Sequence, residues 1–131
     1  RESKDTNDSS LISYFTYDHL TYLFMGDASK RIEKQLMATY DLKADVIKVG
    51  HHGSNTSSDP DFLDSLDCKI ALISCGYKNK YGHPSVETLK TLENLHINTL
   101  CTSACGSIAM HSLFHFSFVV TNDGMFGIIW A

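Results

Sequence analysis

The sequence has 131 residues, 15 of them acidic and 11 basic, which gives a formal net charge of −4. The length suits one domain, and a hydrophobic share of 43% supports a core of its own. A dedicated nucleic-acid-binding domain is normally basic overall, so contact with a polyanion is expected to be local or metal-mediated. The apolar runs are too short to cross a bilayer, and no signal-peptide pattern opens the sequence. The charged and polar residues 1–10 resemble a cut in a longer chain more than a native terminus.

The four cysteines are Cys68, Cys75, Cys101 and Cys105. None of them forms a Cys-x-x-Cys pair, so we do not expect a structural zinc site. Cys75 and Cys101 lie in apolar, strand-like runs and are expected to behave as small buried hydrophobic residues. A disulfide between Cys101 and Cys105 is an open alternative.

The first third of the chain predicts a hairpin followed by a helix. Residues 11–17 and 21–25 read as strands with a turn at Asp18-His19, where His19 is expected to be solvated. Helical spacing follows in Ile32, Leu36 and Tyr40, with Met37 alongside and Lys30, Arg31, Glu33 and Lys34 on the other faces. Either Asp27 or Ser29 could cap this helix.

The remaining elements alternate between strand and helix. Strands are expected at residues 44–49, 70–74 and 97–101, a short helix from Asp59-Pro60, and a hairpin at residues 114–130 that turns at residues 122–124. An amphipathic helix is expected at residues 85–95, with Val86, Leu89, Leu92 and Leu95 facing inward. This order predicts an α/β fold in which helices flank a mixed, largely parallel sheet.

Polar groups follow three of the predicted strands directly. Asp27 follows the second strand, the pair His51 and His52 follows the third, and His83 lies in the loop after the next one. If these strands are parallel, the groups meet at the carboxyl edge of the sheet, where a carboxylate and imidazoles would form a candidate metal site. Alternatively, Asp27 only caps a helix and His83 only covers the sheet edge.

The other histidines show no such placement. His96 precedes a strand, so we expect it on the surface at the opposite edge of the sheet. His111 and His115 are assigned to the terminal hairpin and are expected to be structural.

Three motifs in this order, Gly26-Asp27, His51-His52-Gly53-Ser54 and Gly82-His83-Pro84, resemble the metallo-β-lactamase superfamily. Within it, the resemblance is to the C-terminal domain of ComEC/Rec2-type competence proteins and covers residues 7 to about 108. The family's His-x-His-x-Asp-His motif is absent from the sequence. We therefore expect a single partial domain over residues 1–131, the second half of an αββα sandwich whose first half precedes Arg1.

The resemblance implies a metal-dependent hydrolase with one or two ions, zinc or manganese. Asp27 would bridge the metals and a histidine of the His-His pair would complete the coordination; we favour His52, with His51 beside it, although spacing does not decide between them. His83 would donate a proton or stabilise an oxyanion. Ser54, Asn55 and Thr56 would orient ligands or substrate, and Lys78 and Lys80 could contact phosphate or simply be solvated.

The expected function of the intact domain is that of a phosphodiesterase or nuclease acting on DNA during competence-related uptake. Such a domain would be an extracytoplasmic, soluble part of a membrane protein. One alternative is a small-molecule or cell-wall phosphodiesterase of the same superfamily. Another is a non-catalytic half-domain that acts as a folding or association module. With so few ligands the chain alone should bind metal poorly and be inactive, and its exposed sheet face should pair with the missing half or form a homodimer.

Overall fold

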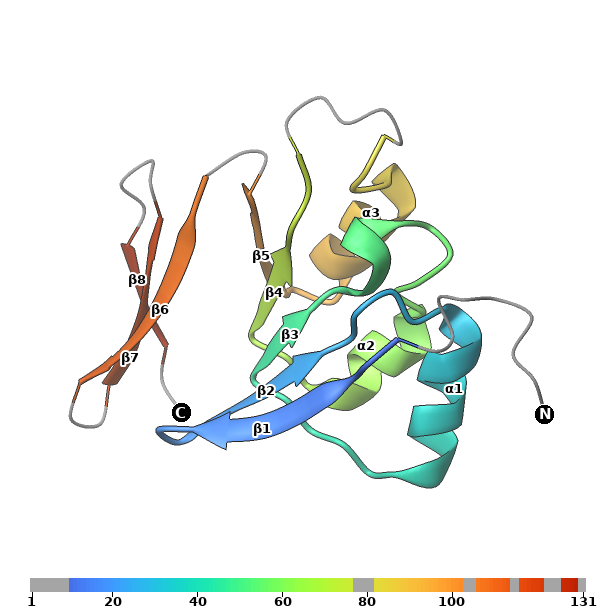
Figure 1. The fold of residues 1–131 in the computed structure, drawn as a ribbon, viewed down its shortest axis with the longest axis horizontal. Coiled ribbons are helices and arrows are strands. Elements are labelled where there is room, and N and C mark those ends of the chain that lie inside the picture. The colour runs from blue at the N-terminus through green and yellow to red at the C-terminus, as the bar shows by residue number, and fades with distance from the viewer. Residues whose placement is uncertain (1–9, 77–81, 103–105, 114–115, 122–125, 130–131) are drawn as a thin grey trace.

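The computed structural model describes residues 10–76, 82–102, 106–113, 116–121 and 126–129. Its elements, shown in Figure 1, are β1 (Ser13–Tyr17), β2 (Leu20–Phe24), α1 (Lys30–Thr39), β3 (Val46–Lys48), α2 (Pro60–Leu66), β4 (Ile70–Ile73), α3 (Val86–Asn94), β5 (Asn98–Cys101), β6 (Ile108–Leu113), β7 (Phe116–Thr121) and β8 (Phe126–Ile129). Predicted and observed strands agree to within one or two residues at most ends. Within the described parts of the chain, no helix is long and apolar enough to cross a membrane.

The strands form two sheets. The first has the order β1-β2-β3-β4-β5, in which β1 pairs antiparallel with β2 and the other neighbours are parallel. The second is an antiparallel sheet of the order β6-β7-β8. The α/β class with a mixed sheet flanked by helices is therefore confirmed.

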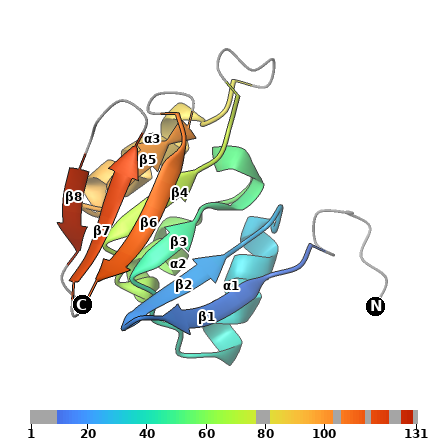
Figure 2. The ribbon, with the colours of Figure 1, turned by 60° about the vertical axis from the view of Figure 1, so that its left-hand side comes forward.

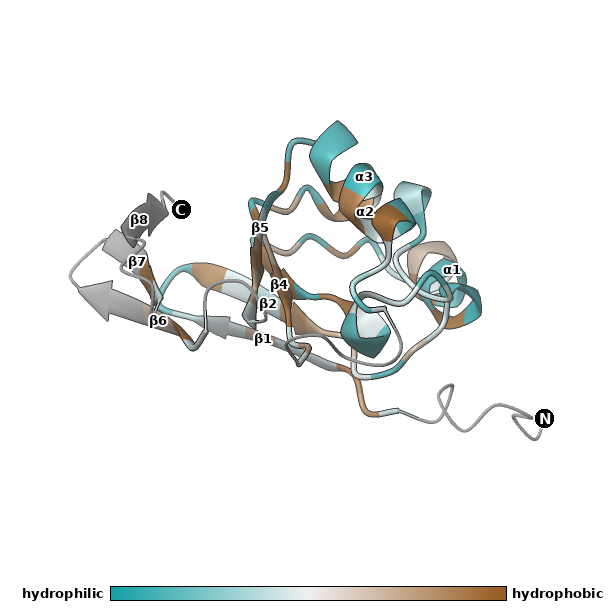
Figure 3. Ribbon diagram, turned by 90° about the horizontal axis from the view of Figure 1, so that it is seen from above, coloured by the Kyte–Doolittle hydropathy of each residue, from teal (hydrophilic) through white to brown (hydrophobic). Residues whose placement is uncertain are grey.

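Helices α1, α2 and α3 cover one face of the five-stranded sheet (Figure 3). The core between them is made of buried strand residues and of helix residues such as Phe62, Leu63 and Leu92, with Ile32 and Leu36 of α1 packed at its margin. Helix α2 begins as the Asp-Pro pair predicted, because the Asp59 side chain accepts hydrogen bonds from the backbone N–H groups of Asp61 and Phe62.

The second sheet packs on part of the opposite face of the first (Figure 2). Val119 of β7, with Ile108 and Met110 of β6 at its margin, joins a second cluster with Leu20, Tyr22, Val46, Ile70 and Leu100. The sequence predicted the β7–β8 hairpin, and the turn assigned to it lies outside the described residues. It did not predict β6 or a separate second sheet.

Two burial predictions in the helices were wrong. Val86 and Leu89 of α3 are exposed by 67% and 40%, whereas Thr88 and Leu92 face the core. In α1, Glu33 was placed on an outer face, yet it is 1% exposed. Ser29, and not Asp27, occupies the N-cap position of α1, so Asp27 lies in the loop before the helix.

Candidate functional site at the carboxyl edge of the sheet

Strands β2, β3 and β4 are parallel neighbours, with Phe24 opposite Lys48 and Lys48 opposite Leu72. The segments that follow them therefore leave the sheet at one edge, as expected. Asp27 comes from the loop after β2, the turn Gly50–Gly53 from the end of β3, and His83 from the segment between β4 and α3. The three predicted polar groups thus emerge at the same edge.

Both histidines of the central turn have left-handed backbone conformations. The φ angle is 48° at His51 and 53° at His52. Each non-glycine residue held in this region costs on the order of 1 kcal/mol or more, and such residues gather at functional sites. The turn is held in place by the His51 N–H, which donates to the carbonyl of Gly26 at 2.8 Å. This bond ties the histidine turn to the residue just before Asp27.

The orientation of His52 follows from its hydrogen bond. Its Nδ1 lies 2.5 Å from the carbonyl oxygen of Ser74, which can only accept, so Nδ1 carries the proton. In the neutral ring the lone pair is therefore on Nε2, which lies 3.9 Å from Oδ1 of Asp27. A backbone carbonyl that fixes one ring nitrogen and leaves the other as a lone-pair donor is the usual setting of a metal-binding histidine, and the carboxylate of Asp27 lies near that donor.

His51 and His83 form the other side of the cluster. Their ring centroids are 5.7 Å apart in an edge-to-face arrangement, and those of His51 and His52 are 6.5 Å apart. Nδ1 of His51 is 3.2 Å from Oγ1 of Thr56. Partial burial, followed by the charges that His51 and His52 carry when protonated, lowers the pKa of His83. His83 is thus biased towards the neutral imidazole at neutral pH.

Gly53 joins the histidine turn to the Gly-His-Pro motif. Its φ is +79°, and a Cβ atom placed there would lie 2.7 Å from Cβ of Pro84. Its carbonyl accepts a hydrogen bond from the backbone N–H of Ser85 at 2.8 Å. Only glycine allows this approach without displacement, so residues far apart in sequence are held side by side.

The polar residues after the turn have different surroundings. Ser54 is buried, and its Oγ lies 3.0 Å from Oγ1 of Thr56. Asn55 and Thr56 are exposed. Lys78 and Lys80, predicted to contact phosphate, lie outside the described residues. Ser54 and Thr56 therefore form a hydroxyl pair next to His51, while no contact of the two lysines is described.

Nothing in the sequence pattern indicates the contacts that hold the loop after the turn. The buried carboxylate of Glu33 accepts hydrogen bonds from the backbone N–H groups of Ser58 at 2.6 Å and Asp59 at 2.7 Å. Burial raises its pKa to about 7, against the lowering effect of these two bonds. The Ser57 hydroxyl donates to the carbonyls of Gly50 and Ser54. A glutamate in a charged helix looks solvated in sequence, and only the fold brings it to this loop.

The donors at this edge suit a metal in kind but are few. Asp27 offers a carboxylate and His52 a correctly oriented imidazole nitrogen, which are common zinc and manganese ligands. Among the described residues, no group of three or more His, Cys, Asp or Glu side chains is close enough to hold an ion. The two residues therefore fit as part of a metal site that needs further ligands.

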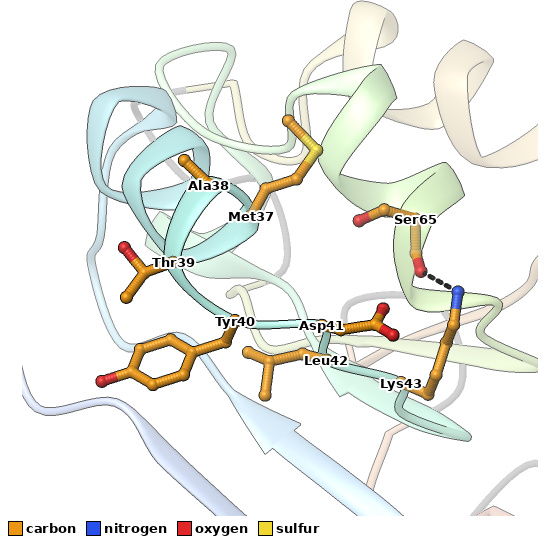
Figure 4. A pocket seen from close by; sticks show the side chains of 8 residues that line it. All are labelled: Met37, Ala38, Thr39, Tyr40, Asp41, Leu42, Lys43 and Ser65. Carbon is orange, nitrogen blue, oxygen red and sulfur yellow. Dashed lines mark hydrogen bonds between the residues drawn. The ribbon is translucent and has the colours of Figure 1, made fainter.

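A pocket of about 340 Å³ lies elsewhere, at the C-terminal end of α1 (Figure 4). It is lined by Met37, Ala38, Thr39, Tyr40, Asp41, Leu42, Lys43 and Ser65. The Lys43 ammonium donates to the Ser65 carbonyl across it at 2.8 Å. None of the predicted site residues lines this pocket, and it offers no imidazole or thiol to a ligand.

Comparison with known proteins finds similarity to competence proteins. ComE operon protein 3 of Bacillus subtilis (strain 168) is 38% identical over 103 residues, which is 78% of this chain and 13% of that protein. Competence protein ComA of Neisseria gonorrhoeae is 32% identical over 110 residues, 82% of this chain and 16% of that protein. Recombination protein 2 of Haemophilus influenzae is 32% identical over 89 residues, 68% of this chain and 11% of that protein.

No protein-family model matches the chain. The chain spans 13% and 16% of the length of the first two relatives, so it corresponds to one segment of much longer proteins. These relatives support the predicted resemblance to ComEC/Rec2-type competence proteins. Over most of its length, the chain is homologous to one segment of ComEC/Rec2-type competence proteins.

Proposed function

We propose that this chain is the second half of a metal-dependent phosphodiesterase domain of the metallo-β-lactamase type, a nuclease acting on DNA during competence-related uptake. The observation that carries the proposal is the convergence of Asp27, His51, His52 and His83 at one sheet edge, with both adjacent histidines in left-handed conformations. Three relatives are named for competence or recombination, which favours DNA over other phosphodiesters.

Asp27 and His52 are the residues that would hold the metal, zinc or manganese. A bound divalent ion would supply a water of lowered pKa and neutralise charge on phosphate oxygens. The missing ligands would come from the segment that precedes this one in the longer protein. The Ser74 carbonyl contributes by fixing the proton of His52 on Nδ1, so that Nε2 remains a lone-pair donor.

His83 and the hydroxyl pair would act on the substrate. A neutral His83 can donate an N–H hydrogen bond to a phosphate oxygen as negative charge develops there, or pass a proton to the leaving oxygen. The Thr56 hydroxyl next to His51 Nδ1 can orient that ring, and Ser54 in turn lies next to Thr56. Asn55 is exposed beside this pair and available to substrate, and Lys78 and Lys80 are further candidates for phosphate contact.

The preceding segment would also cover a sheet face that the second sheet leaves open. Phe15 and Tyr17 of β1 are exposed by 41% and 59%, and Phe15 stacks on Tyr22 with centroids 5.1 Å apart. Phe24 meets Phe15 edge to face at 5.3 Å. Because the relatives extend far beyond this segment, we propose the first half of the same domain as the occupant, with a homodimer as the competing arrangement.

The proposal is tested by nuclease assay of the full-length protein with zinc or manganese. Asp27→Ala and His83→Ala are each expected to lower the turnover of single-stranded DNA by 100-fold or more, on the order of the loss from removing a metal ligand or a catalytic acid. For the two histidines with left-handed backbones, asparagine is the suitable replacement, because it tolerates that conformation and lacks the imidazole. If His52 is the ligand, His52→Asn should lower the turnover of DNA more than His51→Asn does.

The matched control is His96→Asn, since His96 is exposed at the other edge of the sheet and also has a positive φ of 58°. It should retain full activity. Undiminished turnover in Asp27→Ala and His83→Ala would refute the assignment. Faster turnover of small phosphodiesters than of DNA would favour the small-molecule alternative. If calorimetry detects no metal binding by the full-length protein, a non-catalytic module is favoured.

A further inference from the structure

Two cysteines next to the candidate site are in direct contact. Sγ of Cys75 and Sγ of Cys101 are 3.1 Å apart, without an S–S bond between them. Cys101 ends β5, and Cys75 follows the end of β4, its parallel neighbour. Because Ile73 is opposite Cys101 and side chains alternate along a strand, Cys75 and Cys101 lie diagonally on the same face of the sheet.

The contact does not depend on the two side chains alone. The hydroxyl of Thr102 accepts a hydrogen bond from the backbone N–H of Cys75 and donates one to its carbonyl, both at 3.0 Å. Thr102 directly follows Cys101, so these bonds hold the backbone of Cys75 against the end of β5. The main chain therefore brings the two sulfur atoms together.

We propose that Cys75 and Cys101 are a disulfide-forming pair that fastens the end of β4 to the end of β5. Both side chains are only half-buried, so a disulfide reagent can reach them. Cys68 is also half-buried, and burial raises the pKa of its thiol to about 12, which disfavours the thiolate that reacts. The sequence left a Cys101–Cys105 disulfide open as an alternative, and Cys105 lies outside the described residues.

The oxidant is a disulfide, either of low molecular weight or of a thiol–disulfide oxidoreductase. One of the two cysteines attacks a sulfur of that disulfide as a thiolate, forming a mixed disulfide and releasing one thiol. The other cysteine then attacks the mixed disulfide, forming the Cys75–Cys101 bond and releasing the second thiol. The pair loses two protons and two electrons, and the oxidant takes them up as its two thiols.

The position of the pair gives the bond a consequence for the candidate site. Cys75 follows Ser74, whose carbonyl accepts the Nδ1–H of His52. The covalent loop from Cys75 to Cys101 also contains His83 and the whole of α3. Oxidation would therefore restrain the main chain on which His52 and His83 depend. Formation of the disulfide does not require the proposed hydrolysis and is tested by a separate experiment.

The test is peptide mapping of the full-length protein by mass spectrometry. The protein is treated with oxidised glutathione, remaining thiols are alkylated, and it is digested with trypsin without reduction. Because no Lys or Arg follows Lys90 in the sequence, Cys101 and Cys105 stay on one tryptic peptide. The Cys105→Ser variant removes this ambiguity, and Cys68→Ser serves as the control for a thiol outside the proposed pair.

We expect a peptide containing Cys75 joined to the peptide containing Cys101, in the wild type and in both of these control variants. Cys75→Ser and Cys101→Ser should each abolish it. A linked pair that disappears in Cys105→Ser, or glutathione adducts on single cysteines with no cross-link, would overturn the proposal. These results do not depend on whether the protein hydrolyses DNA.

A second measurement covers the case in which a serine variant folds poorly. Oxidation of the wild type should raise the melting temperature of this domain on the order of 10 °C, from the loss of chain entropy in the unfolded state. Amide hydrogen exchange at residues 73–76 and 98–102 should slow, while the β1–β2 hairpin stays unchanged. Unaltered exchange at both strand ends in cross-linked protein would contradict the fastening role.

Discussion

Gly53 is the residue on which the shape of the candidate site depends most directly. It combines a φ of +79° with a backbone so close to Pro84 that a Cβ atom on Gly53 would lie 2.7 Å from the Cβ of that proline. Gly53→Ala is therefore expected to lower the free energy of unfolding by roughly 1–3 kcal/mol, from left-handed strain and overpacking together. Chemical denaturation measures this difference.

The control for that substitution is Gly76→Ala. A Cβ atom at Gly76 meets nothing within 4 Å, and its φ is not in the left-handed region. The stability of Gly76→Ala should stay within about 0.5 kcal/mol of the wild type. Equal effects of the two substitutions would mean that Gly53 has no special role.

Glu33 makes the stability of the domain depend on pH. Because burial raises its pKa from 4.5 to about 7, the folded state binds a proton that the unfolded state has already lost across this range. The free energy of unfolding therefore falls as pH rises from 4.5 to 7, by about 3 kcal/mol at 1.36 kcal/mol per pKa unit. This contribution is fully present below pH 4.5 and lost above pH 7.

Glu33→Gln should flatten this slope while weakening the hydrogen bonds. Glutamine has one acceptor oxygen, so one of the N–H groups of Ser58 and Asp59 loses its partner, at about 1–3 kcal/mol. The variant should thus be clearly less stable than wild type at pH 5 and closer to it at pH 8. Denaturation curves at both pH values, with exposed Glu93→Gln as the reference, test this. An unchanged slope would contradict the assignment.

At the scale of elements, the spacing of apolar residues in helix α3 predicted the helix but not the face that it buries. Val86, Leu89, Leu92 and Leu95 are spaced by three, and at about 100° per residue each step drifts by about 60° around the helix. Four such residues span half the circumference and cannot all face the sheet. The buried pair is Thr88 and Leu92, spaced by four, and the Thr88 hydroxyl donates to the Ser54 carbonyl at 3.4 Å.

The buried face of α3 contributes to stability and its exposed face does not. Leu92→Ala should destabilise the domain by about 2–5 kcal/mol, because Leu92 is fully buried in the core. The free energy of unfolding of Val86→Ala should be equal to that of the wild type within about 0.5 kcal/mol, or slightly higher. The reason is that Val86 is 67% exposed and alanine favours the helix. Thermal denaturation measures both variants. A large loss of stability in Val86→Ala would mean that the helix buries the face that the sequence suggested.

Strand positions could be predicted well because buried parallel strands are short apolar runs bounded by polar residues, as at Val46–Lys48 and Ile70–Ile73. The approach of Asp27 to the histidines could also be predicted, since it follows from strand order alone. Contacts that depend on helix rotation or on long-range approach could not. The contact of Glu33 with the backbone of Ser58 and Asp59 and that of Cys75 with Cys101 are of that kind, and so is the separation of β6–β8 into a second sheet.

At the scale of the whole molecule, the two faces of the five-stranded sheet are covered unequally. The helices cover one face throughout, whereas the second sheet reaches the other face mainly around Leu100, Ile70 and Leu20. The aromatic group of Phe15, Tyr17, Tyr22 and Phe24 lies towards the β1 side of this face, and its outer members are exposed. Aromatic side chains gathered on a sheet face are typical of a surface that is buried in the complete protein.

The chain produced alone should therefore self-associate through this face, and the preceding segment of the protein should compete for it. Phe15→Asp places a charge in the middle of the aromatic group and is expected to shift the chain to monomer, as measured by light scattering. Tyr40→Asp is the matched control, because Tyr40 is as exposed as Tyr17, at 59%, but lies at the end of α1 on the helix side. If the wild-type chain is monomeric at high concentration and does not bind the preceding segment, the face is not an interface. If Tyr40→Asp also gives monomer, association uses the helix layer instead.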